Sequence, residues 1–162
     1  MRTVYVMRHC KSRWDEKDAS DIERRLCPRG KRDARAVGAN LALSEPPPDL
    51  VISSPARRSR STAKRVARAW GYENDIVVDE RLYEGTRQGQ LQLLRETKDS
   101  VQSLMLIGHN PGLEELVFFL GDRPVALGTG TVVRIDLPIE RWDQLDLPAD
   151  GTVRQVWEPQ RS

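Results

Sequence analysis

Cysteine and histidine are both scarce in this chain of 162 residues, which contains two of each. Cys10 and Cys27 are too few for a disulfide framework, so we expect free thiols and a cytoplasmic protein. The histidines are His9 and His109, and neither an HxxxH nor a CxxC spacing occurs. Because a zinc site takes three or four such ligands, the sequence disfavours metal binding.

The chain also lacks long apolar runs and a large net charge. No apolar run approaches the ~20 residues that cross a bilayer, and no signal peptide is visible, so we expect no membrane partner. The 26 Lys and Arg nearly cancel the 24 Asp and Glu, leaving a formal charge of +2. This balance argues against general nucleic-acid affinity. Basic residues do cluster between Arg24 and Arg35 and between Arg57 and Arg68, which leaves room for a local anion site.

The length suits one domain, and we expect residues 1–162 to form a single domain whose core needs no covalent staples. Short β-prone runs alternate with segments of helical periodicity. The predicted strands span residues 3–7, 49–53, 76–78, 103–108, 131–137 and 152–157. The predicted helices span residues 31–43, 55–70, 89–97 and 113–120, and loops are expected over 11–28 and from Leu82 to Gly85.

This alternation predicts an α/β fold, a three-layer α/β/α sandwich with a mostly parallel central sheet covered on both faces. The predicted core includes large apolar side chains at strand or periodic helix positions: Trp70, Leu104, Leu106, Phe118 and Phe119. In such sheets, ligands bind beyond the carboxyl ends of the strands. The functional residues are therefore expected at that edge.

Both histidines of the chain directly follow predicted strands. His9 comes after Arg8 at the end of the first strand, and His109 follows the strand that ends at Gly108. Arg58 lies in the first turns of the helix that starts at Pro55, where unpaired N–H groups favour an anion. A guanidinium group matches phosphate oxygens, so these side chains indicate an anion site. We expect most other arginines of that helix to form a solvated cationic face.

Five short segments, in order along residues 3–137, match motifs of one family. They are Met7 to Cys10, Asp21 to Gly30, Ser54 to Ala63, Leu82 to Glu84 and Gly108 to Gly112. The first resembles an Arg-His-Gly signature, and the third resembles Ser-Pro-x-x-Arg-x-x-x-Thr-Ala, with Arg58 at the arginine. Together the segments resemble the histidine phosphatase (phosphoglycerate mutase-like) superfamily, and in particular its short SixA-like phosphohistidine phosphatases.

The resemblance implies a phosphoglycerate mutase-like fold and a phosphatase that uses no cofactor and no metal. His9 would be the nucleophile and would form a phosphohistidine intermediate. Arg8, Arg58 and His109 would bind the phosphoryl oxygens, where negative charge is spread in the transition state.

Three further residues are candidates for the site. Glu84 is a candidate general acid, with a surface loop carboxylate as the competing interpretation. Arg24 and Trp14 are candidates for the rim that contacts substrate, although one exposed aromatic side chain is also ordinary. A good leaving group such as phosphohistidine would need little protonation, so the acid can be absent.

The sequence departs from the family pattern at three places, one of which is the general acid, for which Glu84 is the nearest candidate. Cys10 replaces the usual glycine after the nucleophile, so its side chain either crowds the pocket or points away from it. Arg25 replaces a proline, which we interpret as neutral. A cysteine beside His9 can also be a thiolate nucleophile. That chemistry requires an arginine six positions after the cysteine, in a Cys-x5-Arg loop, and the residue six positions after Cys10 is Glu16.

The leading substrate is phosphohistidine on a phosphorelay or phosphotransferase protein, because a chain this short leaves little room for insertions that would cap the site. Small phosphate esters are the alternative within the same chemistry. Mutase activity is disfavoured because it needs a longer chain with a phosphoglycerate pocket. From a different class, the chain could be a non-catalytic module that binds phosphate or a partner. The oligomeric state is left open.

Overall fold

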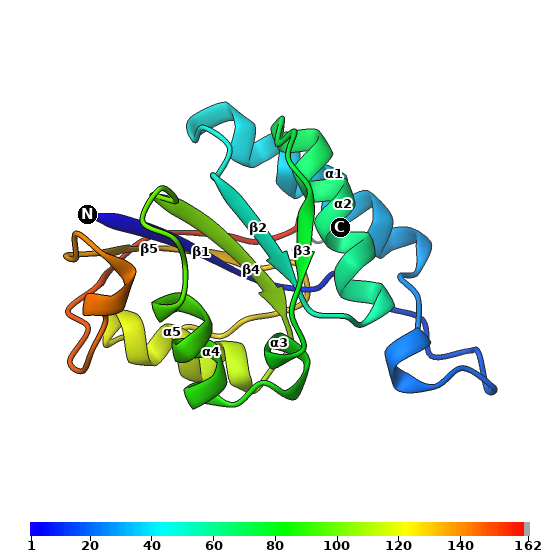
Figure 1. Ribbon diagram of the computed structural model, residues 1–162. Helices are drawn as coiled ribbons and strands as arrows, with labels where there is room; N and C mark the ends of the chain where they lie inside the picture. The colour runs from blue at the N-terminus through cyan, green and yellow to red at the C-terminus, as the bar shows by residue number, and fades with distance from the viewer. Residues whose placement is uncertain (161–162) are drawn as a thin grey trace.

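A computed structural model describes residues 1–160 and contains a six-stranded sheet in the order β3-β2-β4-β1-β5-β6 (Figure 1). The strands are β1 (Arg2–Arg8), β2 (Leu50–Ser53), β3 (Ile76–Val78), β4 (Ser103–Gly108), β5 (Val132–Leu137) and β6 (Thr152–Trp157). Strands β1 to β4 are parallel, whereas β5 runs antiparallel to both β1 and β6. The prediction of a mostly parallel sheet is confirmed.

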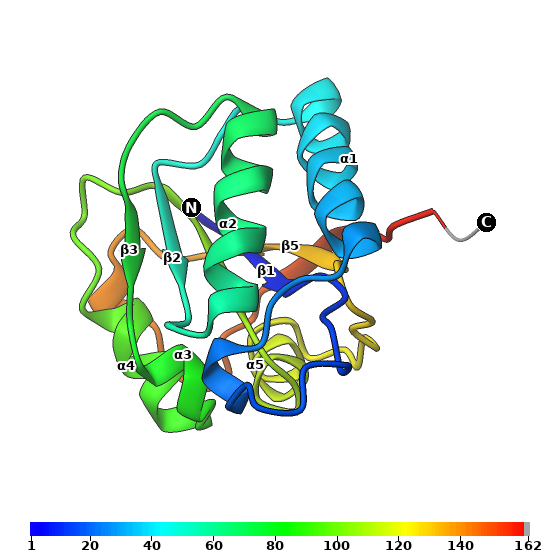
Figure 2. The same cartoon turned by 90° about the vertical axis from the view of Figure 1, so that its right-hand side faces the viewer.

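Helices cover both faces of this sheet. On one face lie α1 (Pro28–Ser44) and α2 (Arg57–Trp70), side by side (Figure 2). The other face carries α3 (Arg81–Glu84), α4 (Arg87–Arg95), α5 (Gly112–Gly121) and the short η2 (Trp142–Gln144), while η1 (Asp21–Glu23) lies in the loop after β1. Alternation along β1 supplies both cores, because Val4 and Val6 pack on the α4–α5 side and Tyr5 and Met7 on the α1–α2 side. The three-layer α/β/α sandwich is therefore confirmed.

Local chemistry sets where the two helices of the α1–α2 face begin and end. Sγ of Cys27 accepts a hydrogen bond from the backbone N–H of Gly30 at 3.4 Å and so caps the start of α1. Three consecutive prolines follow that helix, and proline cannot continue it. Helix α2 ends at Trp70 and is followed by Gly71, whose φ of 90° is the left-handed conformation that glycine adopts without a steric penalty.

Two expectations from the sequence are wrong. Phe118 was predicted in the core but is 51% exposed, because the sheet-facing side of α5 is made by other residues: Leu113, Leu116, Val117 and Leu120. The segment from Leu82 to Gly85 was predicted as the start of a loop, but residues 81–84 form the single helical turn α3. Leu82 is fully buried and packs in the core between this turn and the sheet.

The topology brings the ends of three neighbouring strands together. In the sheet, β4 lies between β2 and β1, with Arg8 paired with Gly108 and Ser53 with Ile107. The next residues along the chain, among them His9 and His109, therefore emerge at one edge. Among residues 1–160, none of the helices combines the length and the apolar character needed to cross a bilayer.

Candidate active site

The two histidines face each other at the carboxyl edge of the sheet. Their ring centroids are 5.1 Å apart and their planes are inclined by 53°. Arg58, the second residue of α2, reaches between them and is only 4% exposed. His9 and Arg58 are 49 residues apart in the chain, and Arg58 and His109 are 51 residues apart. The fold therefore brings together three side chains that are distant in sequence.

His9 is held in one tautomer. Its Nδ1 lies 2.7 Å from the carbonyl oxygen of Cys10, and since a carbonyl only accepts, Nδ1 carries the proton. Nε2 then has a free lone pair, and the Nε–H of Arg58 points at it from 3.4 Å. Burial is the main reason that the pKa of His9 falls to about 3, assisted by His109 and the nearby arginines. Near pH 7 the ring is therefore a neutral nucleophile with Nε2 as its reactive atom.

Arg58 is fixed by the loop that follows β1. Its two terminal nitrogens donate to the backbone oxygen of Asp21 at 2.6 Å and to the Asp21 carboxylate at 3.0 Å. Burial alone would raise the pKa of Asp21, but hydrogen bonds from Tyr83 and Arg58 outweigh it and lower the pKa to about 2. Asp21 is therefore ionised and holds the guanidinium plane against both histidines.

His109 is held by two serines and an aromatic ring. Its Nε2 lies 2.7 Å from Oγ of Ser54 and 3.3 Å from Oγ of Ser59, and its Nδ1 lies 3.4 Å from a terminal nitrogen of Arg58. Because Arg58 only donates, Nδ1 of neutral His109 accepts and Nε2 carries the proton. The ring of Tyr83 packs edge-on against His109 at 5.4 Å. Burial, followed by the charge of Arg58, lowers the pKa of His109 to about 4.

Arg8 lies beside this group at the end of β1. One of its terminal nitrogens donates to the backbone oxygen of Leu127 at 3.1 Å, which anchors the side chain. Burial and the charge of Arg58 lower its pKa, although an arginine stays protonated at any relevant pH. Two guanidinium groups therefore border the imidazole of His9.

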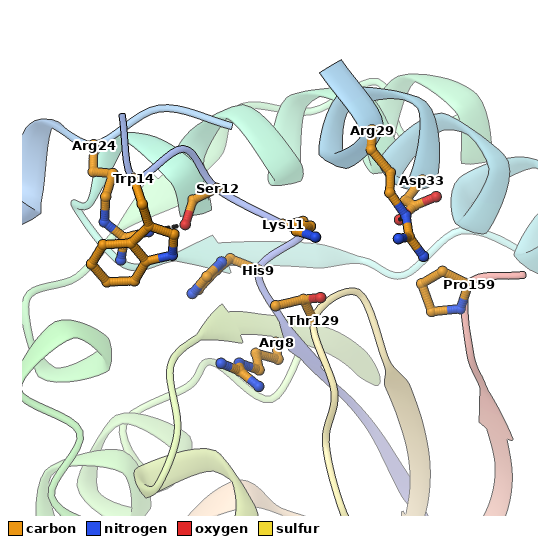
Figure 3. Close-up of a pocket in the computed structure, with 10 residues that line it drawn as sticks. All are labelled: Arg8, His9, Lys11, Ser12, Trp14, Arg24, Arg29, Asp33, Thr129 and Pro159. Carbon is orange, nitrogen blue, oxygen red and sulfur yellow. Dashed lines mark hydrogen bonds and ion pairs between the residues drawn. The ribbon is translucent and has the colours of Figure 1, made fainter. Parts of the chain in front are cut away.

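A pocket of about 370 Å³ opens beside His9 (Figure 3). Its lining combines four basic residues with one acidic residue: Arg8, His9, Lys11, Ser12, Trp14, Arg24, Arg29, Asp33, Thr129 and Pro159. The Arg24 guanidinium stacks over the Trp14 ring at 3.7 Å and also bonds Ser12 and Asp21. Trp14 is 79% exposed, so this stacked pair forms an outer wall of the pocket. The excess of positive charge suits an anionic ligand.

Glu84 takes no part in these hydrogen bonds. It is exposed at the end of α3, and no hydrogen bond or ion pair of its side chain occurs among residues 1–160. Its neighbour Tyr83 is the residue of that turn that contacts His109 and donates to the Asp21 carboxylate at 2.8 Å. The part of the chain from residue 1 to 160 also contains no group of three or more His, Cys, Asp or Glu arranged to hold a metal ion.

The Cys10 side chain points away from the pocket. It is fully buried in the core beneath α1 and α2, and burial raises the pKa of its thiol to about 12. Its backbone N–H donates to Oγ1 of Thr62 at 3.1 Å. A protonated thiol turned into the core is a poor nucleophile, which disfavours the thiolate interpretation. Cys10 and Cys27 are both free, as the sequence predicts.

Four contact residues were not identified as site candidates from the sequence: Asp21, Ser54, Ser59 and Tyr83. Asp21, Ser54 and Tyr83 each fall inside a motif noted above, so the motif positions are the signal that could have found them. Ser59 lies in the segment from Ser54 to Ala63 as well, but at a position that the motif leaves unspecified. Its role follows only from the first turn of α2, which places its hydroxyl near His109.

Comparisons with known proteins identify the family of this chain. The sequence model of the histidine phosphatase superfamily (branch 1) matches residues 4–104. An uncharacterized protein of Mycobacterium tuberculosis is 32% identical over 114 residues, which cover 70% of this chain and 69% of that protein.

Two solved structures share the whole fold. One is a protein of Agrobacterium tumefaciens assigned as the phosphohistidine phosphatase SixA, with a TM-score of 0.83, 26% identity and coverage of 98% of both chains. The other is the protein histidine phosphatase SixA complexed with tungstate, with a TM-score of 0.78, 25% identity and coverage of 97% of both chains. The chain belongs to the histidine phosphatase superfamily.

Proposed function

We propose that this protein is a metal-independent phosphatase in which Nε2 of His9 attacks phosphorus. One observation carries the proposal. The hydrogen bond from Nδ1 to the Cys10 carbonyl leaves the Nε2 lone pair facing Arg58, in a site lined by cationic groups. A neutral imidazole so oriented can react in line with a phosphoryl group that the arginines hold.

In the first step the Nε2 lone pair forms a bond to phosphorus, and the bond to the leaving group breaks with its electron pair. Arg8, Arg58 and His109 hold the three phosphoryl oxygens, where charge is spread in the transition state. In the second step water attacks phosphorus, the N–P bond breaks, and inorganic phosphate leaves neutral His9. The cationic side chains supply the charge that divalent metals supply in other phosphoryl-transfer enzymes.

The proposed substrate is phosphohistidine on a protein of a phosphorelay or phosphotransferase system in the cytoplasm. The two SixA neighbours support this class, since both are described as phosphatases of phosphohistidine or of protein histidine. An imidazole leaving group needs little protonation, so the reaction does not depend on an acid at the pocket.

A small phosphate ester is the second candidate substrate. The pocket beside His9 has a volume of about 370 Å³, and its basic wall of Lys11, Arg24 and Arg29 can surround a small anion. An alkoxide is a poorer leaving group than imidazole, so turnover of an alkyl phosphate ester would be slower without a general acid. The ratio of the two rates therefore distinguishes the substrates.

The test compares hydrolysis of para-nitrophenyl phosphate and of a histidine-phosphorylated protein by the wild type and by His9→Ala, with EDTA present. We expect the variant to lose turnover by orders of magnitude and the wild type to prefer phosphohistidine. Tungstate binding serves as the control for folding, because His9→Ala leaves Arg8 and Arg58 in place. Turnover that survives in the variant, or wild-type activity abolished by EDTA, contradicts the mechanism. Absence of turnover in the wild type with intact tungstate binding would indicate a binding module.

A further inference from the structure

The charges of this protein are strongly segregated. Helices α1 and α2 together carry ten basic residues and one acidic residue, whereas the remainder of the chain carries sixteen basic and twenty-three acidic residues. A nearly neutral total thus conceals a cationic layer on an otherwise anionic molecule. Both helices lie on the same face of the sheet (Figure 2).

Only two cations of this layer have acidic partners among residues 1–160: Arg29 pairs with Asp33 and Arg58 with Asp21. The other eight are exposed or half-buried and make no ion pair among residues 1–160: Lys31, Arg32, Arg35, Arg57, Arg60, Lys64, Arg65 and Arg68. We call these eight residues the basic face. Elsewhere arginines are commonly paired, as Arg81 is with Asp79 and Arg134 with Asp136. The mutual repulsion among the eight cations of the basic face is therefore not offset by ion pairs.

The packing of the two helices concentrates this charge. They approach closely at Gly38, where an added Cβ would lie only 2.7 Å from Cβ of Ala69. Next to this contact runs a groove of about 760 Å³ whose charged lining is entirely basic: Arg35, Lys64, Arg65 and Arg68. Lys64 and Arg68 are one turn apart, and like charges at that spacing destabilise a helix. An anionic partner in the groove would relieve the repulsion.

The basic face is continuous with the candidate active site. Arg58 points inward to the histidines, whereas Arg57, its neighbour in the same turn, is exposed. From Arg57 to Arg68 the helix extends about 16 Å, which is beyond the reach of a small ester bound at His9. At the start of α1, Arg29 lines the pocket itself. A partner that contacts both the basic face and the pocket beside His9 must therefore be macromolecular.

We propose that the basic face is a docking surface for an acidic surface of the phosphorylated substrate protein. This inference rests on the proposed function and specifies its partner. Charge complementarity would speed encounter and orient the phosphohistidine toward His9. A protein is favoured over nucleic acid or an anionic membrane because the rest of the molecule carries excess negative charge, which repels an extended anion.

The test uses two double charge reversals with the same change in net charge. Lys64→Glu with Arg68→Glu alters the basic face, and Lys98→Glu with Arg123→Glu alters exposed, unpaired cations elsewhere. The substrates are an acidic phosphotransfer domain phosphorylated on histidine and para-nitrophenyl phosphate. At low salt we expect kcat/KM for the domain to fall about tenfold in the first variant only. Added salt should shrink that difference, and the small substrate should be hydrolysed equally by all three proteins.

Several outcomes overturn the proposal. Equal losses in both double variants would reduce the effect to net charge, and no loss in either would leave the face without a role in docking. The wild type and both variants are also tested for binding to a DNA duplex, for binding to phosphatidylserine vesicles and for self-association. If DNA binding, vesicle binding or self-association depends on Lys64 and Arg68 while turnover of the domain does not, the basic face binds DNA, a membrane or a second copy of the chain instead.

Failure of the proposed function is distinguishable from failure of docking. If the wild type hydrolyses neither substrate, the proposed function is wrong, and direct binding of the phosphorylated domain to the three proteins still tests the face. Binding weakened only in the Lys64 and Arg68 variant supports docking, whereas equal binding by all three contradicts it.

Discussion

Nε2 of His9 and Nε of Arg58 lie 3.4 Å apart, although 49 residues separate them in the chain. A second nitrogen of Arg58 lies at the same distance from Nδ1 of His109. The guanidinium therefore borders the space in which a phosphoryl group must sit to react with His9. Its fork can bind two phosphoryl oxygens at once.

This geometry predicts that Arg58→Lys lowers kcat by about 10²–10³, because an ammonium group cannot reproduce the planar fork. Steady-state hydrolysis of para-nitrophenyl phosphate measures the effect. Arg57→Lys, one position earlier and exposed, is the matched control and should retain wild-type kcat. A lysine variant within threefold of wild type would show that the fork is not needed.

Asp21 positions Arg58, so Asp21→Asn should lower kcat by about tenfold through a less ordered guanidinium. Asp18→Asn changes an exposed carboxylate in the same loop and should have no effect. Because Asp21 acts through Arg58, adding Asp21→Asn to Arg58→Lys should cause little further loss. Fully additive losses would mean that the two residues act independently.

The orientation of Cys10 predicts that Cys10→Ala keeps kcat within about twofold of wild type. The free energy of unfolding should fall by about 1 kcal/mol, because a buried sulfur leaves a small cavity in the core. Denaturant titration and the hydrolysis assay measure the two quantities. Loss of turnover without loss of fold would place the thiol in the chemistry and revive the thiolate mechanism.

Binding of an oxyanion should be linked to proton uptake at His109. In the free protein its pKa is about 4 and Nδ1 accepts from Arg58, whereas a bound dianion needs a donor there and raises that pKa. Calorimetry of tungstate binding at pH 6 in buffers of different ionisation enthalpy should detect the uptake, which His109→Gln should abolish. Heats that do not depend on the buffer would contradict it.

Stability should fall as the pH drops below about 6.5. Burial lowers the pKa of His9 to about 3 and that of His109 to about 4, so below pH 6.5 the unfolded chain binds protons that the folded chain does not. The free energy of unfolding should then decrease by roughly 2 kcal/mol per histidine between pH 6.5 and 5. Denaturant titrations of the wild type and of His9→Asn with His109→Gln test this. An equally steep decline in the double variant would assign it to other groups.

The α/β layers were predictable from the sequence because the signals involved are local. Alternation and helical periodicity reflect neighbours within about four residues, and the rule for the carboxyl ends of parallel strands then brings His9, Arg58 and His109 to one edge. Phe118 was misplaced because α5 is apolar on more sides than the sheet covers. Only packing decides which side is buried.

The sequence by itself determined the order of the elements, the family motifs and the identity of the residues at the sheet edge. Tertiary structure alone decided the hydrogen bonds between Arg58 and Asp21, the burial of the Cys10 side chain in the core and the assembly of the basic face. Each of these depends on segments far apart in the chain that meet only when α1, α2 and the loop after β1 pack together. Their energies come from distance and burial, which no local pattern encodes.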